Sequence, residues 1–213
     1  MIYRGTDLDN FNPTGPSYKL KNAYKGVRFL YMGGFPQDTN ANKKGGCTLM
    51  SAWHRYEKLL IYRDASLLLG GPCTPNSQLL SWRESLIDSN RVHILGVVEP
   101  SDVPLVMRAV DAILIPSLNE GMPNVGMEAI ACGRPVLGSN VGGMPELVRD
   151  GLEGMLVDAT DIDVWGKTLI WAASNREALI NMGESARHRA IELFDSTSYG
   201  KCLYEFYKEI VPM

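Results

Sequence analysis

Two carboxylates, Glu120 and Glu128, stand around a glycine-containing turn near the middle of the chain. Glu120 lies just before a helix predicted over residues 125–132, and Glu128 lies about one turn inside it. Carboxylates accept hydrogen bonds from hydroxyl groups, whereas the first N–H groups of a helix favour phosphate. The arrangement suits a molecule with hydroxyls at both ends and phosphates between them, such as a nucleotide-diphosphate sugar. On spacing alone, the alternative is an ordinary turn residue followed by a solvated helix residue.

The elements that must position this turn are strands and helices in alternation. Six short apolar, β-branched runs predict strands over residues 27–32, 66–69, 92–97, 112–116, 135–139 and 154–157. Their nearly continuous apolar character is typical of strands that are covered on both faces. We therefore expect an α/β fold, a Rossmann-like, doubly wound parallel sheet of about six strands with helices on both faces. Ligands bind at the carboxyl ends of such strands, which is where the Glu120 turn falls.

Helical patterns fill the intervals between these strands. They are expected around residues 49–60, over 76–85, from 101, over 125–132, from 145, from 161, over 176–193 and over 198–211. Ser101 and Asp102 can both cap a helix start, and Asp161 and Asp163 place acid in a first turn. Gly133 is expected to end the helix over 125–132 in a left-handed conformation.

The last predicted helix carries a stripe of apolar and aromatic residues, namely Tyr199, Leu203, Phe206, Tyr207 and Ile210. Such a stripe packs either on the core of its own domain or on a second domain, and the sequence leaves both open. Two long segments are predicted to be loops, residues 10–26 and 33–46. The second follows the first strand directly, and loops of that length are usually functional or mobile.

Composition argues against several classes of protein. The 213 residues include 45% hydrophobic and 21% charged residues, as in an ordinary globular domain. The net charge of −3 gives no reason to expect a nucleic acid partner. No run approaches the roughly 18 apolar residues of a membrane helix, and residues 1–10 do not resemble a signal peptide. Four separated cysteines without a C-x-x-C pair are expected to be buried, reduced thiols, which favours a cytoplasmic protein.

Other motifs are weak. Gly166-Lys167-Thr168 matches the end of a phosphate-binding P-loop, but Asp161 stands where that motif needs glycine and no strand is predicted before it. Two D-x-D pairs, residues 7–9 and 161–163, have the form that some sugar-transfer enzymes use to hold a metal. They are better explained as a connecting segment and a helix start. The three histidines are scattered, so we expect neither a metal site nor a histidine base.

A longer pattern runs from Pro116 to Glu146. It reads P-S-x-x-E-G-x-P-N-x-x-x-E-A-x-A-x-G-x-P-V, followed by V-G-G-x-P-E. This pattern closely resembles the donor-sugar domain of GT-B-fold glycosyltransferases, in particular the large retaining group called family 4 or group 1. Glu120 and Glu128 match the E-x7-E motif of that family. Segments 2–13, 29–45, 68–72 and 94–112 resemble its other elements in order, so the resemblance covers essentially the whole chain.

The resemblance implies roles for the charged residues. Glu120 would contact the donor sugar and support the transition state, and Glu128 would bind the ribose hydroxyls. Lys44, the lysine before the K-G glycine, would neutralise the diphosphate, with Lys43 as its neighbouring rival. Charge develops on the diphosphate as the glycosidic bond breaks, and a fixed cation beside a helix start lowers that barrier.

The resemblance also implies roles for backbone groups. The donor would meet the glycine loop at Gly33 and Gly34, and backbone amides would hold the sugar and phosphates at Gly121, Met122, Pro123, Asn124 and Val125. Pro123 lacks an N–H and can only shape the turn.

One segment departs from the family pattern. The family usually reads G-R-L after the first strand, and its arginine pairs with the diphosphate, whereas this chain reads Gly33-Gly34-Phe35. Loss of a bidentate, charge-assisted contact weakens a phosphate site. Either another cation compensates, with Arg28, Lys43 and Arg134 nearest in sequence, or the donor is held differently. The departure also allows an inactive member of the family.

A GT-B enzyme has two Rossmann-like domains, and the resemblance places this chain as the second, the C-terminal half. Residues 1–26 would lead in from the first domain, residues 27–195 would bind the nucleotide sugar, and residues 196–213 would form a helix that packs toward the acceptor domain. That domain would be present in cis or as a partner subunit, and this chain alone would be inactive.

The implied activity is that of a hexosyltransferase. It would transfer a hexose-type sugar with retention from a UDP- or GDP-type donor to a polysaccharide, lipid or glycan precursor, without a metal cofactor. The protein would be cytoplasmic, with peripheral membrane contact through the acceptor domain as a further expectation. The alternatives are a non-catalytic nucleotide-sugar-binding module or subunit and, less well supported, a GT-B-fold epimerase or phosphorylase.

Overall fold

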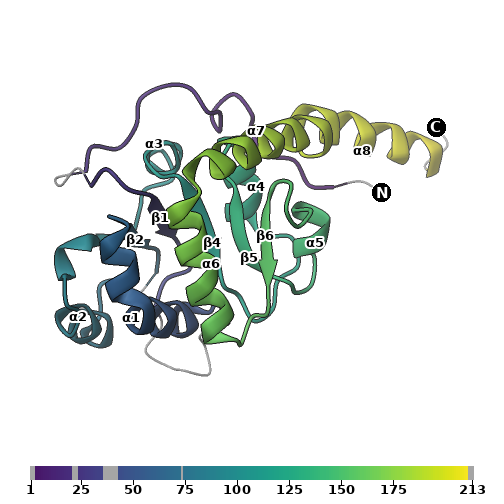
Figure 1. Ribbon diagram of the computed structural model, residues 1–213. Helices are drawn as coiled ribbons and strands as arrows, with labels where there is room; N and C mark the ends of the chain where they lie inside the picture. Colours follow the sequence, from purple (N-terminus) through teal and green to yellow (C-terminus); the bar gives the residue numbers. More distant parts are fainter. Residues whose placement is uncertain (1–2, 21–23, 36–42, 73, 211–213) are drawn as a thin grey trace.

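The computed structural model describes residues 3–20, 24–35, 43–72 and 74–210. Six strands form one parallel sheet in the order β3-β2-β1-β4-β5-β6 (Figure 1). The strands are β1 (Arg28–Tyr31), β2 (Ser66–Gly70), β3 (Val92–Gly96), β4 (Ala112–Ile115), β5 (Val136–Ser139) and β6 (Gly154–Val157). Every boundary lies within one residue of its predicted run, and the Rossmann-like, doubly wound fold is confirmed.

Alternate residues of each strand point to opposite faces of the sheet and enter two separate cores. In β1, Phe29 and Tyr31 belong to one buried cluster and Leu30 to the other. In β2, Leu67 and Leu68 divide in the same way. Both faces are covered, so neither has room for unpaired polar side chains, and this explains the nearly continuous apolar strands.

Helices cover both faces of the sheet. The face of Phe29 packs against α1 (Gly46–Tyr62), α2 (Ser77–Glu84) and α6 (Ile162–Ser174). The opposite face packs against α3 (Val103–Arg108), α4 (Asn124–Ala131), α5 (Met144–Leu147) and much of α7 (Arg176–Leu193). A short 3-10 turn, η2 (Ser89–Arg91), precedes β3. These helices match those predicted between residues 49 and 193.

Helix ends follow the predicted signals, with one exception. The Asp161 carboxylate accepts hydrogen bonds from the N–H groups of Asp163 and Val164 and caps α6. Gly133 follows α4 with a φ of +64°, in the left-handed region. The predicted cap of α3 is wrong, because Asp102 stands at its start without a side-chain cap bond. Asp102 has helical backbone angles, whereas a capping residue is extended.

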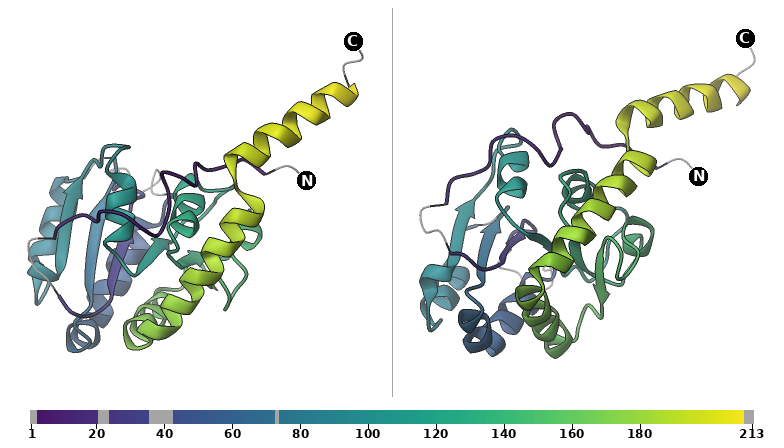
Figure 2. Two further views of the ribbon diagram at one scale, coloured as in Figure 1. Left: turned by 90° about the horizontal axis from the view of Figure 1, so that it is seen from above. Right: turned by 45° about the horizontal axis from the view of Figure 1, so that its top comes forward.

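The last helix, α8 (Ser196–Ile210), projects away from the sheet (Figure 2). Within the described chain, none of its residues is buried. Phe206 and Tyr207 of the apolar stripe are 47% and 55% exposed. Packing of this stripe on the chain's own core is therefore wrong. Cys202, expected to be buried, is exposed for the same reason, whereas Cys132 is buried. Cys73 lies outside the described residues.

The lead-in segment is joined to the start of α8. The Thr6 N–H donates to the Phe194 carbonyl at 2.6 Å, and the Ser196 N–H donates to the Thr6 carbonyl at 3.1 Å. A Cβ on Gly5 would lie 2.3 Å from Ser196 Cα, so only glycine allows this approach. The two segments lie side by side, although they come from opposite ends of the chain (Figure 2).

Two arginines fix the rest of the lead-in segment. Arg187 donates to the Phe11 carbonyl at 2.9 Å, and Arg108 donates to the Pro16 carbonyl at 2.7 Å. The predicted loop over residues 10–26 contains neither helix nor strand in its described part. Residues 21–23 of this loop, and residues 36–42 of the predicted loop over 33–46, lie outside the described residues.

Candidate functional site

A cavity of about 310 Å³ opens where the carboxyl ends of β1 and β4 meet the start of α4. The strand order reverses between β1 and β4, and the crevice at such a switch point is where doubly wound sheets bind ligands. The lining includes six of the predicted site residues, namely Gly33, Lys44, Glu120, Pro123, Asn124 and Val125. Six residues predicted from the sequence for the donor site therefore lie together at one edge of the sheet.

The centre of this cavity is an ion pair. Lys44 Nζ lies 2.6 Å from Glu120 Oε1, and the Ser117 hydroxyl donates to the same oxygen at 2.8 Å. The Glu120 side chain is 9% exposed, whereas that of Lys44 is 50% exposed. A carboxylate this far from water needs charged or hydrogen-bonding partners, and these two donors supply them.

Glycine brings Lys44 to Glu120. Gly45 has a φ of +72°, and a Cβ there would lie 1.7 Å from the Pro116 carbonyl oxygen. Close by, the Leu118 N–H donates to the Lys43 carbonyl at 2.8 Å. The backbone before α1 thus packs directly on the segment that leaves β4, and a larger residue at position 45 would separate them.

A second glycine loop supports Glu120 from the other side. A Cβ on Gly142 would lie 1.7 Å from the Glu120 carbonyl oxygen, and one on Gly143 would lie 2.0 Å from that of Gly121. The Gly143 N–H donates to the Glu120 carbonyl at 3.2 Å. The sequence analysis noted this loop and gave it no role at the site, although its glycine pair was the available signal.

Two helix starts also belong to the site. α1 begins after Gly45 and α4 begins after Pro123. In the described residues, neither start has a side-chain cap or an acidic residue in its first turn. The start of α4 therefore presents the positive end of a helix dipole to the cavity beside Lys44, and both favour an anion next to Glu120.

Glu128 lies apart from this cavity. It is partly buried in α4 but does not belong to the cavity lining. Burial raises the pKa of its carboxyl to about 7, and the charge of Arg4 opposes part of that shift. Gly121, which is exposed, and Met122, which packs on a core cluster, are also absent from the lining. The two glutamates therefore occupy different environments, with only Glu120 at the cavity.

Gly34 lies behind the cavity wall, where a side chain does not fit. Its φ is +72°, and a Cβ would lie 2.3 Å from the Pro72 carbonyl oxygen. Its N–H donates to the Gly70 carbonyl at 3.2 Å, so it packs on the end of β2. In this backbone a side chain at position 34, arginine included, would therefore meet the Pro72 carbonyl.

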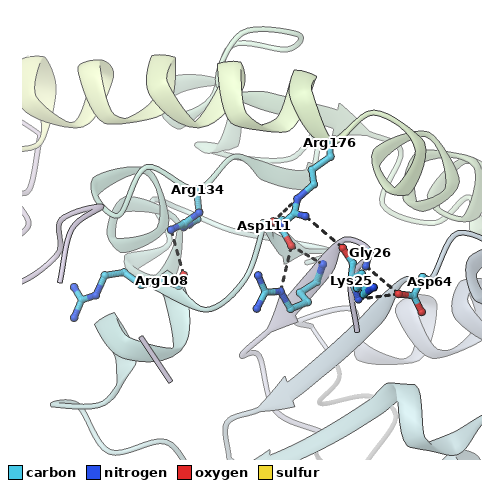
Figure 3. A network of polar contacts seen from close by, with 8 residues as sticks. Lys25, Gly26, Asp64, Arg108, Asp111, Arg134 and Arg176 are labelled. Atoms are coloured by element: carbon cyan, nitrogen blue, oxygen red, sulfur yellow. Dashed lines mark hydrogen bonds and ion pairs between the residues drawn. The ribbon is translucent and has the colours of Figure 1, made fainter. Parts of the chain in front are cut away.

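Two of the three cations considered as replacements lie elsewhere. Arg28 pairs with Asp111 at 3.5 Å, and Asp111 also binds Arg176 at 2.9 Å. Arg134 donates to the Arg108 carbonyl at 3.2 Å (Figure 3). Arg28 begins β1 and Arg134 precedes β5, so both stand at the amino ends of strands, opposite the cavity. They were wrong candidates. Lys43, the third, is exposed and does not line the cavity.

Two polar residues of the cavity lining, Tyr31 and Ser117, were not among the predicted site residues. Ser117 belongs to the P-S-x-x-E pattern, three residues before Glu120, and this spacing was a usable signal. Tyr31 ends an apolar strand, where an aromatic residue predicts core packing and nothing more. Among the described residues, no group of three or more histidine, cysteine or acidic side chains is placed to hold a metal. No helix in these same ranges is long and apolar enough to cross a membrane.

Comparison with known proteins places this chain in a family. Residues 26–175 match a family model described as "Glycosyl transferases group 1". The D-inositol 3-phosphate glycosyltransferase of Corynebacterium efficiens is 36% identical over 127 residues, which cover 58% of this chain and 30% of that protein. The chain therefore spans about a third of the length of the curated relatives that it matches.

Solved structures share the fold over nearly the whole chain. Sucrose-phosphate synthase from Thermosynechococcus elongatus superposes with a TM-score of 0.81 at 26% identity and covers 98% of this chain and 52% of that one. HepE of Anabaena, in complex with UDP-glucose, superposes with a TM-score of 0.79 at 20% identity and covers 98% of this chain and 57% of that one. The second likeness, at this low identity, is evidence for the fold alone.

Proposed function

Because the chain belongs to the group 1 glycosyltransferases and has the fold of a C-terminal GT-B domain, we propose that it binds the nucleotide-diphosphate sugar of a retaining hexosyltransferase. The acceptor would be a polysaccharide, lipid or glycan precursor. The observation that carries the proposal is the Lys44–Glu120 pair, set beside the start of α4 at the switch point of the sheet. We propose a UDP- or GDP-type donor and test UDP-glucose first, the compound bound to HepE, a protein of the same fold.

Different residues of the site would bind different parts of the donor. The diphosphate would lie against the starts of α1 and α4, with Lys44 turning toward it. Negative charge grows on the diphosphate as the glycosidic bond breaks, and a lysine with prepositioned backbone amides stabilises that charge without reorganisation. The amides in question are those of Asn124 and Val125, while Pro123 shapes the turn. In this proposal no metal ion takes the charge, so a chelator is expected to leave donor binding unchanged.

Glu120 and Glu128 would act at different parts of the donor. Glu120 is held at one carboxylate oxygen by Lys44 and Ser117, and we propose that it accepts a hydrogen bond from a sugar hydroxyl and supports the transition state. We propose that Glu128, outside the cavity, binds the ribose hydroxyls through an extension of the site along α4. Gly121 and Met122 would lie between the part of the site that binds the sugar and the part that binds the ribose.

The acceptor would be held by a second domain, in cis or as a partner subunit. Support comes from α8, whose apolar side chains are exposed on one projecting helix beside the lead-in segment (Figure 2). We propose that residues 196–213 pack toward that domain, that residues 1–26 lead in from it, and that residues 27–195 bind the donor. By itself this chain would bind donor and transfer little or no sugar. Cytoplasmic location and membrane contact through the acceptor domain stay predictions.

The test is calorimetric titration of the purified chain with a panel of nucleotide sugars and free nucleoside diphosphates. We expect saturable binding of at least one UDP- or GDP-type compound, unchanged by chelator, and no binding of the free hexose. Absence of binding by every nucleoside diphosphate at millimolar concentration would overturn the proposal.

Gly34 favours one second candidate, a non-catalytic nucleotide-sugar-binding module, because its backbone excludes the arginine of the related pattern. The two functions separate when the acceptor domain is supplied. Sugar transfer or slow donor hydrolysis supports the enzyme, whereas tight donor binding without any turnover supports the module.

A further inference from the structure

Tyr31 is a buried tyrosine in the lining of the candidate site, and its hydroxyl contacts the backbone of Lys44. It is the last residue of β1, is 1% exposed, and contributes to the cavity lining. Its ring packs against Phe35, with ring centroids 5.1 Å apart. Packing alone would be served as well by phenylalanine, so the hydroxyl needs its own explanation.

The hydroxyl lies between two backbone segments that flank residues 36–42. It is 3.0 Å from the Gly34 carbonyl oxygen and 3.3 Å from the Lys44 carbonyl oxygen. One O–H group donates to one acceptor or shares its proton between both. Tyr31 therefore connects the glycine loop after β1 to the residue whose side chain reaches Glu120.

Glycines on both segments leave room for this hydroxyl. A Cβ on Gly33 would lie 2.3 Å from the Tyr31 hydroxyl oxygen, and a Cβ on Gly46 would lie 3.1 Å from it. A side chain at position 33 would displace the phenol, and one at position 46 would crowd it. Glycine at positions 33 and 46 thus leaves the space that the Tyr31 hydroxyl occupies.

We propose that Tyr31 is a positioning residue of the donor site, which holds the backbone of Lys44 so that the ammonium group meets Glu120 and, in turn, the diphosphate. This inference rests on the proposed function, because it concerns the binding of that same donor. In this proposal Tyr31 acts through Lys44 and does not itself contact the reacting atoms.

The Tyr31 hydroxyl is suited to hold the Lys44 backbone at every pH. Burial, together with the negative charges of Cys47 and Glu120 when ionised, raises the pKa of Tyr31 far above its ordinary value. The hydroxyl therefore keeps its proton and remains a donor at every pH at which the fold is intact. The hydrogen bond from the Tyr31 hydroxyl therefore fixes the position of Lys44 without making donor binding depend on pH.

The test is a double-mutant cycle on the full chain, with Tyr31→Phe, Lys44→Met and the pair. Binding of UDP-glucose or of the panel member that binds best is measured by calorimetry, and thermal unfolding is followed in parallel. Loss of one hydrogen bond of ordinary strength corresponds to about a five-fold weaker affinity, and we expect that loss from Tyr31→Phe. In the Lys44→Met background the same change should have almost no further effect.

The control is Tyr56→Phe, because that hydroxyl donates to Asp163 at 3.0 Å and Tyr56 lies outside the cavity lining. It should leave affinity unchanged. Unchanged affinity in Tyr31→Phe, or the same fold loss with and without Lys44, would overturn the inference and leave the proposed function standing.

A second measurement separates this inference from failure of the proposed function. Hydrogen exchange of residues 43–49 in the unliganded chain should be faster in Tyr31→Phe than in the wild type, with α6 unchanged. If the wild type binds no nucleotide sugar, the proposed function fails. The exchange measurement then tests by itself whether the Tyr31 hydroxyl holds the backbone of Lys44. Equal exchange in the two proteins would overturn the inference.

Discussion

Lys44 and Glu120 are separated by 76 positions in the sequence, yet their side chains form an ion pair of 2.6 Å in the candidate site. The glutamate is nearly buried and the lysine is half exposed, so the lysine is the partner that a ligand can reach from solvent. A diphosphate beside Lys44 would compete with Glu120 for the ammonium group. Donor binding and release of the Glu120 carboxylate are therefore expected to be linked.

Substitution of Lys44 should weaken donor binding selectively. Lys44→Met removes the charge and keeps the length of the side chain. We expect about ten-fold lower affinity for a nucleoside diphosphate, the range of one charge-assisted hydrogen bond. Lys43→Met is the matched control because Lys43 is exposed and does not line the cavity, and it should change affinity less than two-fold. Equal losses from the two variants, measured by calorimetry, would contradict the assignment.

Substitution of Glu120 should separate binding from transfer. Glu120→Gln keeps the shape and can still accept from Ser117, but removes the charge that pairs with Lys44. We expect nucleoside diphosphate affinity to stay within a few-fold of the wild type. With the acceptor domain supplied, sugar transfer should fall by about 100-fold or more, as for loss of an electrostatic transition-state contact. Full transfer activity in this variant would remove Glu120 from the mechanism.

Glu128 should make stability and binding depend on pH in opposite directions. Its pKa is about 7 in the folded protein, against an ordinary value of 4.5. The folded state thus favours the protonated carboxyl, and the free energy of unfolding should fall as pH rises from about 4.5 to about 7. Ribose hydroxyls donate best to the carboxylate, so donor affinity should rise over the upper part of this range.

Glu128→Gln should flatten both trends. A nucleotide sugar is the suitable ligand, because its diphosphate takes up no proton near neutral pH. Calorimetry near pH 6.5 in buffers of different ionisation enthalpy should show proton release on binding by the wild type and none by the variant. Proton release that persists in the variant would place the titrating group elsewhere.

Gly34 should not tolerate the arginine of the related pattern. Its left-handed backbone and the nearby Pro72 carbonyl oppose any Cβ, so Gly34→Arg should lower the free energy of unfolding by about 1–3 kcal/mol. We expect no gain in diphosphate affinity from the added charge. Gly34→Ala and Gly121→Ala form a matched pair, because a Cβ on Gly121 meets nothing within 4 Å. Denaturant unfolding should show a loss for the first and little change for the second.

The exposed face of α8 should contribute little to the stability of this chain. Substitution of Phe206 and Tyr207 by serine should change the free energy of unfolding by less than about 0.5 kcal/mol each. Phe194→Ala, at a fully buried position, should cost about 3–5 kcal/mol. Chemical denaturation of the three variants gives the comparison. A large loss from either serine variant would mean that α8 packs on this domain.

The strands could be predicted because both faces of the sheet are covered. Burial on two sides leaves little choice but apolar residues, and the runs in β2 and β4 are entirely buried. The start of α6 could be predicted from residue type, because the Asp161 side chain caps the first N–H groups of that helix. The start of α3 at Asp102 was not, because a cap depends on backbone angles that residue type alone does not determine.

The site was only partly predictable, because distance along the chain does not reveal position on the sheet. Arg28 and Arg134 lie near the motifs in sequence and yet stand at the opposite edge, since each marks the beginning of a strand. Glu120 and Glu128 are eight residues apart, but Glu120 precedes α4 and lines the cavity, whereas Glu128 lies within α4 and outside the lining. Tyr31 could not be recognised, because its role depends on carbonyl groups that the fold brings to it.

The pairing of Thr6 with Phe194 and Ser196 has a mechanical consequence. The first described residues and the start of α8 are held together by two backbone hydrogen bonds and by the contact at Gly5. The two bonds lie on either side of Asp195, so they hold Thr6 at the junction between α7 and α8. A change in the angle between these two helices would have to lengthen or break one of them.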